Sequence, residues 1–292
     1  MKNSSILIVL ALGIIWGSNF IYMKMAAVYL DPMQVTFYRV VFGLLPVLIY
    51  AIYKKALKLE DLKYSIHFFM MSLLAAVIYY YGFVKGSSLL LSGIAGALSG
   101  LIPVFSFLLA ALFLKEEKIT KVAIFGLVLG FLGVVIISGV FSEDLKSTNI
   151  EGSLAIIVGA LSVGASFIYA KKFIMPLNLN PAALTTYQLS FALLIMLIIV
   201  DYEGINDIWQ DTHSSLGMVL GLGIFGTGFA YIMYYYAIKK FGALLASSIT
   251  YLPPVVALVI GFFIVDEEIK TSDFFATALI FLGVFLINKR KA

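Results

Sequence analysis

Polar and aromatic side chains recur every three or four residues inside otherwise apolar stretches, which places each set on one helix face. The sets are Trp16 and Asn19; Ser92, Gly96, Ser99 and Pro103; Ser162, Ser166 and Tyr169; Thr227, Tyr231 and Tyr234; and Ser247, Thr250, Tyr251 and Pro254. Such a face lines a solute cavity or lets helix backbones approach closely. Close packing is the simpler interpretation for an isolated serine. Trp16, Asn19 and Tyr231 are predicted to face a cavity, since a Trp or Asn at mid-depth is costly against lipid.

Tyrosine runs and prolines extend this pattern. Tyr79–Tyr81 and Tyr234–Tyr236 lie toward the ends of apolar stretches, where tyrosine belts are normal, so at most two of each run face inward. Pro103 and Pro254 each free a helix carbonyl, which binds solute in a cavity or is satisfied by a neighbouring hydroxyl. Bending at both prolines would suit a gate. The predicted solute-binding residues are Trp16, Asn19, Tyr79, Tyr80, Ser99, Ser166, Tyr231, Thr250 and Tyr251.

Charged side chains are nearly absent from the middle of the apolar stretches. All 16 acidic residues fall in the breaks or at the ends, so a buried carboxylate, the usual proton or cation relay in a membrane, is not expected. A neutral or zwitterionic solute therefore suits the sequence, although aromatic rings can hold a cation without a carboxylate. Lys24 and Arg39 either bind a solute carboxylate or extend toward lipid headgroups. We favour the second interpretation, with Arg39 as the better candidate ligand because it interrupts an apolar stretch beside Tyr38.

Composition excludes most other classes of protein. The 292 residues are 62% hydrophobic and 12% charged, which is too apolar for a soluble globular domain and excludes disorder. The absence of cysteine removes thiol chemistry and thiolate metal sites. Gly164-Ala165-Ser166 faintly resembles a serine-protease motif, but no mid-membrane histidine follows to act as base. We expect no enzyme activity, no cofactor and no metal.

Apolar runs of about 20 residues predict an all-α membrane protein with ten transmembrane helices. The runs are 5–27, 33–53, 64–84, 88–114, 119–140, 152–173, 181–200, 214–238, 242–264 and 272–288. The first run is too long for the core of a removable signal peptide. Alternate breaks and chain ends collect 15 of the 20 basic residues on one side, which predicts cytoplasmic termini. This asymmetry explains the basic charge balance, so no nucleic-acid partner is expected.

The two halves of the chain, residues 1–145 and 146–292, resemble each other. Trp16-Gly17-Ser18-Asn19-Phe20 aligns with Val163-Gly164-Ala165-Ser166-Phe167, and Phe37-Tyr38-Arg39 aligns with Thr186-Tyr187-Gln188. Asp31-Pro32 matches Asn180-Pro181, the two tyrosine runs match, and Pro103 followed by Glu116-Glu117 matches Pro254 followed by Glu267-Glu268. Because each half holds five predicted helices, the second half must be inverted. Inverted repeats are a recurring transporter design, with the site at their interface.

On these residues the chain resembles the EamA-type members of the drug/metabolite transporter superfamily. The Trp16–Phe20 stretch, Phe37–Arg39 and the two proline-to-glutamate patterns carry the resemblance, which covers nearly the whole chain. It implies ten helices, cytoplasmic termini, a central cavity and export of amino acids or related metabolites. One departure is Val163, where the first repeat has Trp16, so an aromatic clamp would be one-sided. Gly126, Gly130 and Gly133 suit close packing, and the peripheral place that the resemblance implies for this helix makes Gly126 a candidate dimer contact.

The leading functional prediction is therefore an exporter of small neutral or zwitterionic metabolites, above all amino acids, working by alternating access. The alternative is a multidrug or quaternary-amine transporter with an aromatic cavity. Phosphate-bearing solutes fit less well, because Arg39 and lysines at the ends of runs are the only cations to meet them. We expect a multi-pass protein of a bacterial cytoplasmic (inner) membrane, either a monomer or a weak homodimer. Its expected partners are a small-molecule solute and the lipid bilayer.

Overall fold

A computed structural model describes residues 3–90, 92–114, 119–137, 149–265 and 271–289, and every regular element in these ranges is a helix. The first half contains α1 Asn3–Ala26, α2 Pro32–Tyr53, η1 Leu59–Tyr64, α3 Ser65–Ser72, η2 Leu73–Val77, α4 Ile78–Leu89, α5 Ser92–Ser99, α6 Leu101–Phe113 and α7 Lys121–Ile137. The second half contains α8 Ile150–Tyr169, η4 Ala170–Ile174, η5 Met175–Leu177, α9 Pro181–Ile199, η6 Asp207–Gln210, α10 Thr212–Leu216, η7 Gly217–Phe229, α11 Ala230–Phe241, α12 Ala243–Ser248, η8 Ile249–Tyr251, α13 Leu252–Val265 and α14 Thr271–Lys289. The glutamates of both proline-to-glutamate patterns lie outside the described residues.

Six helical segments in the described ranges are long and apolar enough to cross a bilayer. They are Leu7–Ala26, Pro32–Tyr53, Leu59–Leu89, Ile150–Leu177, Pro181–Ile199 and Thr212–Phe241. Four shorter apolar helices accompany them, at Leu101–Phe113, Lys121–Ile136, Ala243–Val256 and Phe274–Ile287. Helices satisfy their backbone groups internally, which lipid requires. The predicted all-helical membrane class is confirmed.

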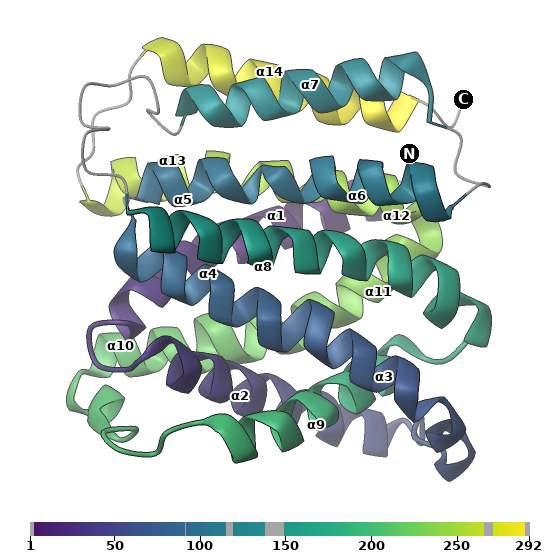
Figure 1. Cartoon of the computed structure of the whole chain (residues 1–292), viewed down its shortest axis with the longest axis vertical. Coiled ribbons are helices and arrows are strands. Elements are labelled where there is room, and N and C mark those ends of the chain that lie inside the picture. The colour runs from purple at the N-terminus through teal and green to yellow at the C-terminus, as the bar shows by residue number, and fades with distance from the viewer. Residues whose placement is uncertain (1–2, 91, 115–118, 138–148, 266–270, 290–292) are drawn as a thin grey trace.

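Most helices run across the view in Figure 1, and some of them, such as α4 and α11, slope in opposite directions. The pair α7 and α14 forms one end of the molecule, the contacting helices α2 and α9 form the other, and both chain ends lie on one side. Large apolar side chains also cover the outside: Ile150, Leu154, Val158 and Leu161 form an exposed stripe along α8. A continuous apolar stripe at helical spacing on the outer surface is the face that lipid covers.

Matching helices in the two halves begin in the same way. Asp31 precedes α2, and its carboxylate accepts hydrogen bonds from the backbone N–H groups of Met33 at 2.6 Å and Gln34 at 3.1 Å. Asn180 precedes α9, and its side-chain oxygen accepts a bond from the Ala182 N–H at 2.8 Å. A polar cap followed by proline satisfies the open N–H groups of a helix start. The sequence match at Asp31-Pro32 and Asn180-Pro181 is thus a match of local structure.

Equivalent glycines make equivalent contacts across the halves. A Cβ on Gly17 of α1 would lie 2.5 Å from Val256 Cβ and 3.0 Å from the Pro253 carbonyl oxygen of α13. A Cβ on Gly164 of α8 would lie 3.1 Å from both Phe105 Cβ and the Ile102 carbonyl oxygen of α6. Ile102 and Phe105 stand at the same distances from Pro103 as Pro253 and Val256 stand from Pro254. Each half therefore inserts its glycine-bearing helix against the proline helix of the other half.

Matching tyrosines repeat this crossed pattern at the loops. The Tyr38 hydroxyl of α2 donates to the Ile205 carbonyl of the second half at 3.1 Å. The Tyr187 hydroxyl of α9 donates to the Lys58 carbonyl of the first half at 3.0 Å. Each tyrosine thus holds the loop that precedes the tyrosine-run helix of the opposite half.

Both proline helices are interrupted just before their prolines. In the first half α5 ends at Ser99 and α6 begins at Leu101. In the second half α12 ends at Ser248, and a turn of 3-10 helix, η8, precedes α13. Proline removes a backbone donor and clashes with the preceding turn, so an interruption at this point has a local cause.

The glycine face of α7 packs within the chain. A Cβ on Gly126 would lie 2.7 Å from the Gly283 carbonyl of α14, and one on Gly133 would lie 2.6 Å from the Ala276 carbonyl. Close packing was predicted correctly. The use of Gly126 as a dimer contact was wrong, because α14 already covers this face.

Candidate solute cavity

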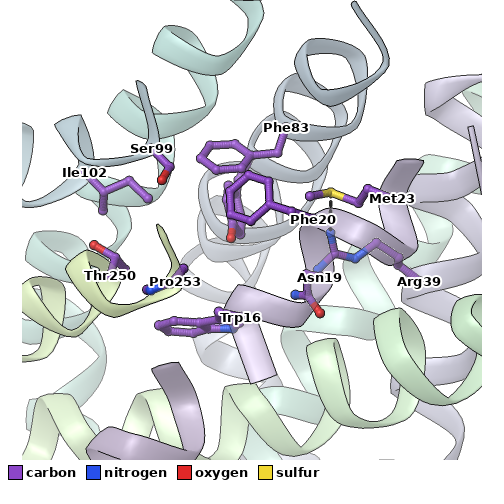
Figure 2. A pocket seen from close by; sticks show the side chains of 11 residues that line it. Trp16, Asn19, Phe20, Met23, Arg39, Phe83, Ser99, Ile102, Thr250 and Pro253 are labelled. Carbon is purple, nitrogen blue, oxygen red and sulfur yellow. Dashed lines mark hydrogen bonds between the residues drawn. The ribbon is translucent and has the colours of Figure 1, made fainter. Parts of the chain in front are cut away.

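A small cavity lies between helices of both halves (Figure 2). Its lining residues are Trp16, Asn19, Phe20 and Met23 of α1, Arg39 of α2, Tyr79 and Phe83 of α4, Ser99 of α5, Ile102 of α6, Thr250 of η8 and Pro253 of α13. The cavity volume is about 20 Å³. A single water needs roughly 10–15 Å³ by this measure, so the space is narrow, with room for about one water. A solute larger than water needs a wider space than this.

One wall of the cavity is made by two equivalent hydroxyls. Ser99 donates its proton to the Gly96 carbonyl at 2.6 Å, and Thr250 donates to the Ser247 carbonyl at the same distance. Because each hydroxyl already donates its proton to a backbone carbonyl, its oxygen can only accept a hydrogen bond from a bound solute. This wall therefore accepts hydrogen bonds.

Aromatic rings form the middle of the cavity. The Phe83 ring lies 4.8 Å from the Tyr79 ring and 6.2 Å from the Phe20 ring, measured between centroids. Figure 2 shows Phe20, Phe83 and Trp16 between the hydroxyl wall and the opposite side of the cavity. Rings arranged in this way offer apolar area and, at their faces, weak attraction for cations.

The opposite side carries a buried guanidinium. Arg39 is 1% exposed, and its guanidinium carbon lies 3.7 Å from the centroid of the Tyr80 ring. The other contacts are long: Nη1 lies 3.6 Å from Met23 Sδ and Nε lies 3.5 Å from Thr227 Oγ1. We assign the Asn19 amide so that both of its groups find partners, which makes its oxygen accept from Arg39 at 3.3 Å.

The burial of Arg39 corrects the interpretation that we favoured from the sequence. Arg39 does not reach toward lipid headgroups, because its guanidinium is buried against Met23 of α1, Tyr80 of α4 and Thr227 of η7. Lys24 is exposed at the end of α1, as expected for a lysine near lipid headgroups.

Six predicted residues surround the cavity together: Trp16, Asn19, Arg39, Tyr79, Ser99 and Thr250. Tyr80, also predicted, lies behind Arg39. The placement brings these side chains together, and their binding of solute stays a prediction.

Three other predicted residues lie elsewhere in the core. The Ser166 hydroxyl donates to the Val163 carbonyl at 2.7 Å and shares a bond of 2.9 Å with the Tyr234 hydroxyl. Tyr231 packs against Tyr234, with ring centroids 5.4 Å apart. The hydroxyl of Tyr251 donates to the Leu127 carbonyl of α7 at 2.9 Å, so this side chain points away from the cavity.

The prolines divide in a similar way. Pro253 lines the cavity, whereas Pro103 and Pro254, the residues predicted to form a gate, do not. Ile102 in the first half is equivalent to Pro253 in the second half. In each half, therefore, the residue directly before the predicted gating proline lines the cavity. Gating by either proline stays a prediction.

The lining residues that sequence reasoning missed follow a simple rule. Phe20 and Met23 lie on the same helix face as Trp16, and Phe83 lies one turn after Tyr79. Ile102 and Pro253 each follow a lining hydroxyl by three residues. A search restricted to polar side chains misses these apolar residues, although their helical spacing from the predicted lining residues places them on the same faces.

The all-helical fold and its long apolar segments define a multi-pass helical membrane protein, and a narrow cavity with polar and aromatic lining lies between its two halves. The EamA-like transporter family matches residues 3–139 and again 150–289. The chain therefore belongs to the EamA-like transporter family, and the predicted family resemblance is confirmed. The two matched segments follow the two similar halves of the sequence.

Individual relatives agree with this assignment. An uncharacterized transporter of Archaeoglobus fulgidus is 26% identical over 97% of this chain and 99% of its own. The uncharacterized transporter YoaV of Bacillus subtilis is 25% identical, with 95% and 94% covered. The uncharacterized inner membrane transporter YedA of Escherichia coli is 26% identical over 68% of this chain and 63% of its own. One solved crystal structure shares the fold, with a TM-score of 0.76 over 100% of this chain and 99% of that chain, at 18% identity.

Proposed function

We propose that this membrane transporter carries small neutral or zwitterionic metabolites, above all amino acids, and that it works as an exporter by alternating access. The observation that carries the proposal is the narrow cavity between the two halves, which combines hydroxyl acceptors, aromatic faces and one guanidinium inside an apolar helical protein. A zwitterion needs a donor region for its carboxylate and an acceptor region for its ammonium group. The cavity supplies both, with Arg39 as the donor and the hydroxyls of Ser99 and Thr250 as acceptors.

The proposed architecture is ten transmembrane helices in two inverted repeats, residues 1–145 and 146–292. The crossed contacts support it: Gly17 and Gly164 insert against matched positions, and Tyr38 and Tyr187 hold loops of opposite halves. Rocking of inverted repeats about a shared site would expose the cavity to each side in turn. The excess of Lys and Arg residues on the side that holds both chain ends favours cytoplasmic termini.

The second candidate is transport of a quaternary amine or another hydrophobic cation, because four aromatic residues line the cavity. Truncation of Trp16 separates the two candidates. A cation held by ring faces loses most of its binding when Trp16 becomes alanine, whereas a solute held by hydrogen bonds loses less. The guanidinium of Arg39 beside the same rings repels a cation and favours the first candidate.

The proposed setting is the cytoplasmic membrane of a bacterium, as a monomer or a weak homodimer surrounded by lipid. The basic asymmetry supports a membrane orientation of this kind, and the relative YedA is named an inner membrane transporter. Crosslinking in native membranes tests the oligomeric state.

Flux into proteoliposomes tests the proposal. Purified protein is reconstituted into lipid vesicles, and a panel of labelled amino acids is added outside them, with and without a pH gradient across the membrane. We expect flux of at least one zwitterion that does not require the gradient, because no carboxylate is predicted within the spans to carry a proton. A panel without any transported zwitterion contradicts the cargo, and strict dependence on the gradient contradicts the mechanism.

Matched serine variants connect the flux to the cavity. Ser99→Ala removes a lining hydroxyl, and Ser166→Ala removes a buried hydroxyl outside the cavity; both hydroxyls donate to the carbonyl three residues earlier. We expect Ser99→Ala to raise KM several-fold and Ser166→Ala to leave it unchanged. Equal effects would show that the cavity has no special place in transport.

A further inference from the structure

The charge of Arg39 has no anionic partner in the part of the chain that the structure describes. The two ion pairs found there, Lys58 with Glu60 and Lys85 with Glu151, lie elsewhere. A guanidinium carries five N–H donors, and those of Arg39 meet one amide oxygen, one hydroxyl and one thioether, all at 3.3 Å or more. A buried charge is costly to maintain without a counter-ion. Its retention needs an explanation beyond these contacts.

The second half of the chain makes the same helix contact without a charge. Gln188 aligns with Arg39, and Tyr235 aligns with Tyr80. The Tyr235 hydroxyl donates a hydrogen bond to the Gln188 side-chain oxygen, and both residues are buried. Arg39 instead lies over the face of the Tyr80 ring. A neutral amide is therefore enough to join these two helices, and packing alone does not account for a cation at position 39.

The position of Arg39 in the cavity lining lets its charge act on a bound solute. The side chain lines the cavity, and Figure 2 shows Arg39 and Asn19 on one side with Ser99 and Thr250 on the other. A guanidinium presents parallel N–H groups that match the two oxygens of a carboxylate. The hydroxyl wall, which offers only acceptors, is complementary to an ammonium group.

We propose that the cavity selects solutes that carry a carboxylate, that Arg39 binds this carboxylate with paired N–H groups, and that the Tyr80 ring holds the guanidinium while the cavity is empty. This inference rests on the proposed transport function and narrows its cargo. A single guanidinium balances a single negative charge, which favours a carboxylate over a doubly charged phosphate. Organic cations are excluded, because the site already holds a positive charge.

The test compares amino acids with their carboxamides, in which a neutral amide replaces the carboxylate, so that each carboxamide carries a net positive charge. The probes are alanine, leucine, phenylalanine and glutamine and the amide of each, supplied as competitors and as labelled solutes to proteoliposomes. We expect the amino acids to move at least about 10-fold faster at low concentration than their amides, since a charge-assisted pair contributes about that factor or more. This preference is the signature of the guanidinium.

Variants at position 39 complete the test. Arg39→Gln places at this position the residue that the second half uses in the same contact, so it is expected to fold; monodispersity on size exclusion checks this. We expect Arg39→Gln to lose the preference for carboxylates by raising KM for amino acids about 10-fold or more, and Arg39→Lys to keep part of it. Gln188→Ala is the control outside the cavity and should keep the preference.

The outcomes separate the inference from the function on which it rests. Equal transport of acid and amide by the wild-type protein, or an unchanged preference in Arg39→Gln, overturns the inference and leaves transport standing. Absence of transport of every probe contradicts the proposed cargo, and the inference falls with it.

Discussion

The contact between Arg39 and Tyr80 makes a measurable prediction about stability. The guanidinium carbon lies 3.7 Å from the ring centroid, and each of the two residues is 1% exposed. Cation–π pairs contribute about 0.5–1 kcal/mol at exposed sites and about 2 kcal/mol when both groups are removed from water. This pair belongs at the upper end. A coupling energy of about 2 kcal/mol corresponds to roughly a 30-fold change in the unfolding equilibrium.

A double-mutant cycle isolates this energy from the other consequences of each substitution. The four proteins are the wild type, Tyr80→Leu, Arg39→Gln and the double variant. Their unfolding free energies are measured in mixed micelles by tryptophan fluorescence, for which Trp16 is a reporter close to the contact. We expect Tyr80→Leu to destabilise the wild type by about 2 kcal/mol more than it destabilises Arg39→Gln. In the Arg39→Gln protein no positive charge lies beside the Tyr80 ring, so removal of the ring there costs no cation–π energy.

Tyr80→Phe is the matched control. It keeps the ring and removes only the buried hydroxyl, which lies near Thr227, Tyr231 and Arg39. It is expected to destabilise the protein less than Tyr80→Leu does, because the ring face under the guanidinium remains. A coupling energy below about 0.5 kcal/mol, or a phenylalanine variant as unstable as the leucine variant, would refute the assignment of the ring as the support for Arg39.

Three further predictions concern packing and helix starts. Gly17→Ala should destabilise the protein by about 1–3 kcal/mol, because the new methyl would lie 2.5 Å from Val256 Cβ. Gly96→Ala is the control: its methyl would lie 3.9 Å from Pro254 Cβ, so the variant should melt at the wild-type temperature in detergent. Asp31→Ala should cost about 1 kcal/mol through loss of the cap of α2, measured by thermal unfolding, and Asp31→Asn should restore most of it. The backbone N–H of Ser214 donates to Asp211, which lowers the pKa of that carboxyl. The cap of α10 should therefore persist as the pH falls through the usual aspartate range and be lost only below it, as measured by amide hydrogen exchange; loss of protection already near pH 5 would contradict this.

Much of the architecture was predictable, because apolar runs and caps act locally. Apolar runs of about 20 residues indicate membrane helices, and in the described ranges six helical segments are long and apolar enough to cross a bilayer, with four shorter apolar helices beside them. Asp31 and Asn180 cap helices for reasons contained within four residues of chain. These features depend little on which helices become neighbours.

The orientation of individual side chains depends on the neighbours and was predicted less well. Thr250 and Tyr251 are adjacent on one polar stripe, but Thr250 faces the cavity and Tyr251 reaches the Leu127 carbonyl. The helix changes to a 3-10 turn at this point, so a periodicity of 3.6 residues no longer predicts the facing direction. Arg39 was misjudged for a related reason: burial depends on which helices cover its face of α2, and sequence spacing does not contain that information.

The cavity is asymmetric although the contacts that build the fold are repeated. Nine of its eleven lining residues belong to the first half, and Thr250 and Pro253 alone come from the second. The sequence differences between the halves explain this. Val163 stands where the first half has Trp16, and Gln188 stands where it has Arg39, so the second half lacks the large ring and the charge that line the site. The lining is therefore concentrated on helices of the first half. On the proposed mechanism, a solute bound to Arg39 meets mainly residues of the first half, and Thr250 and Pro253 are the lining residues that would move with the second half.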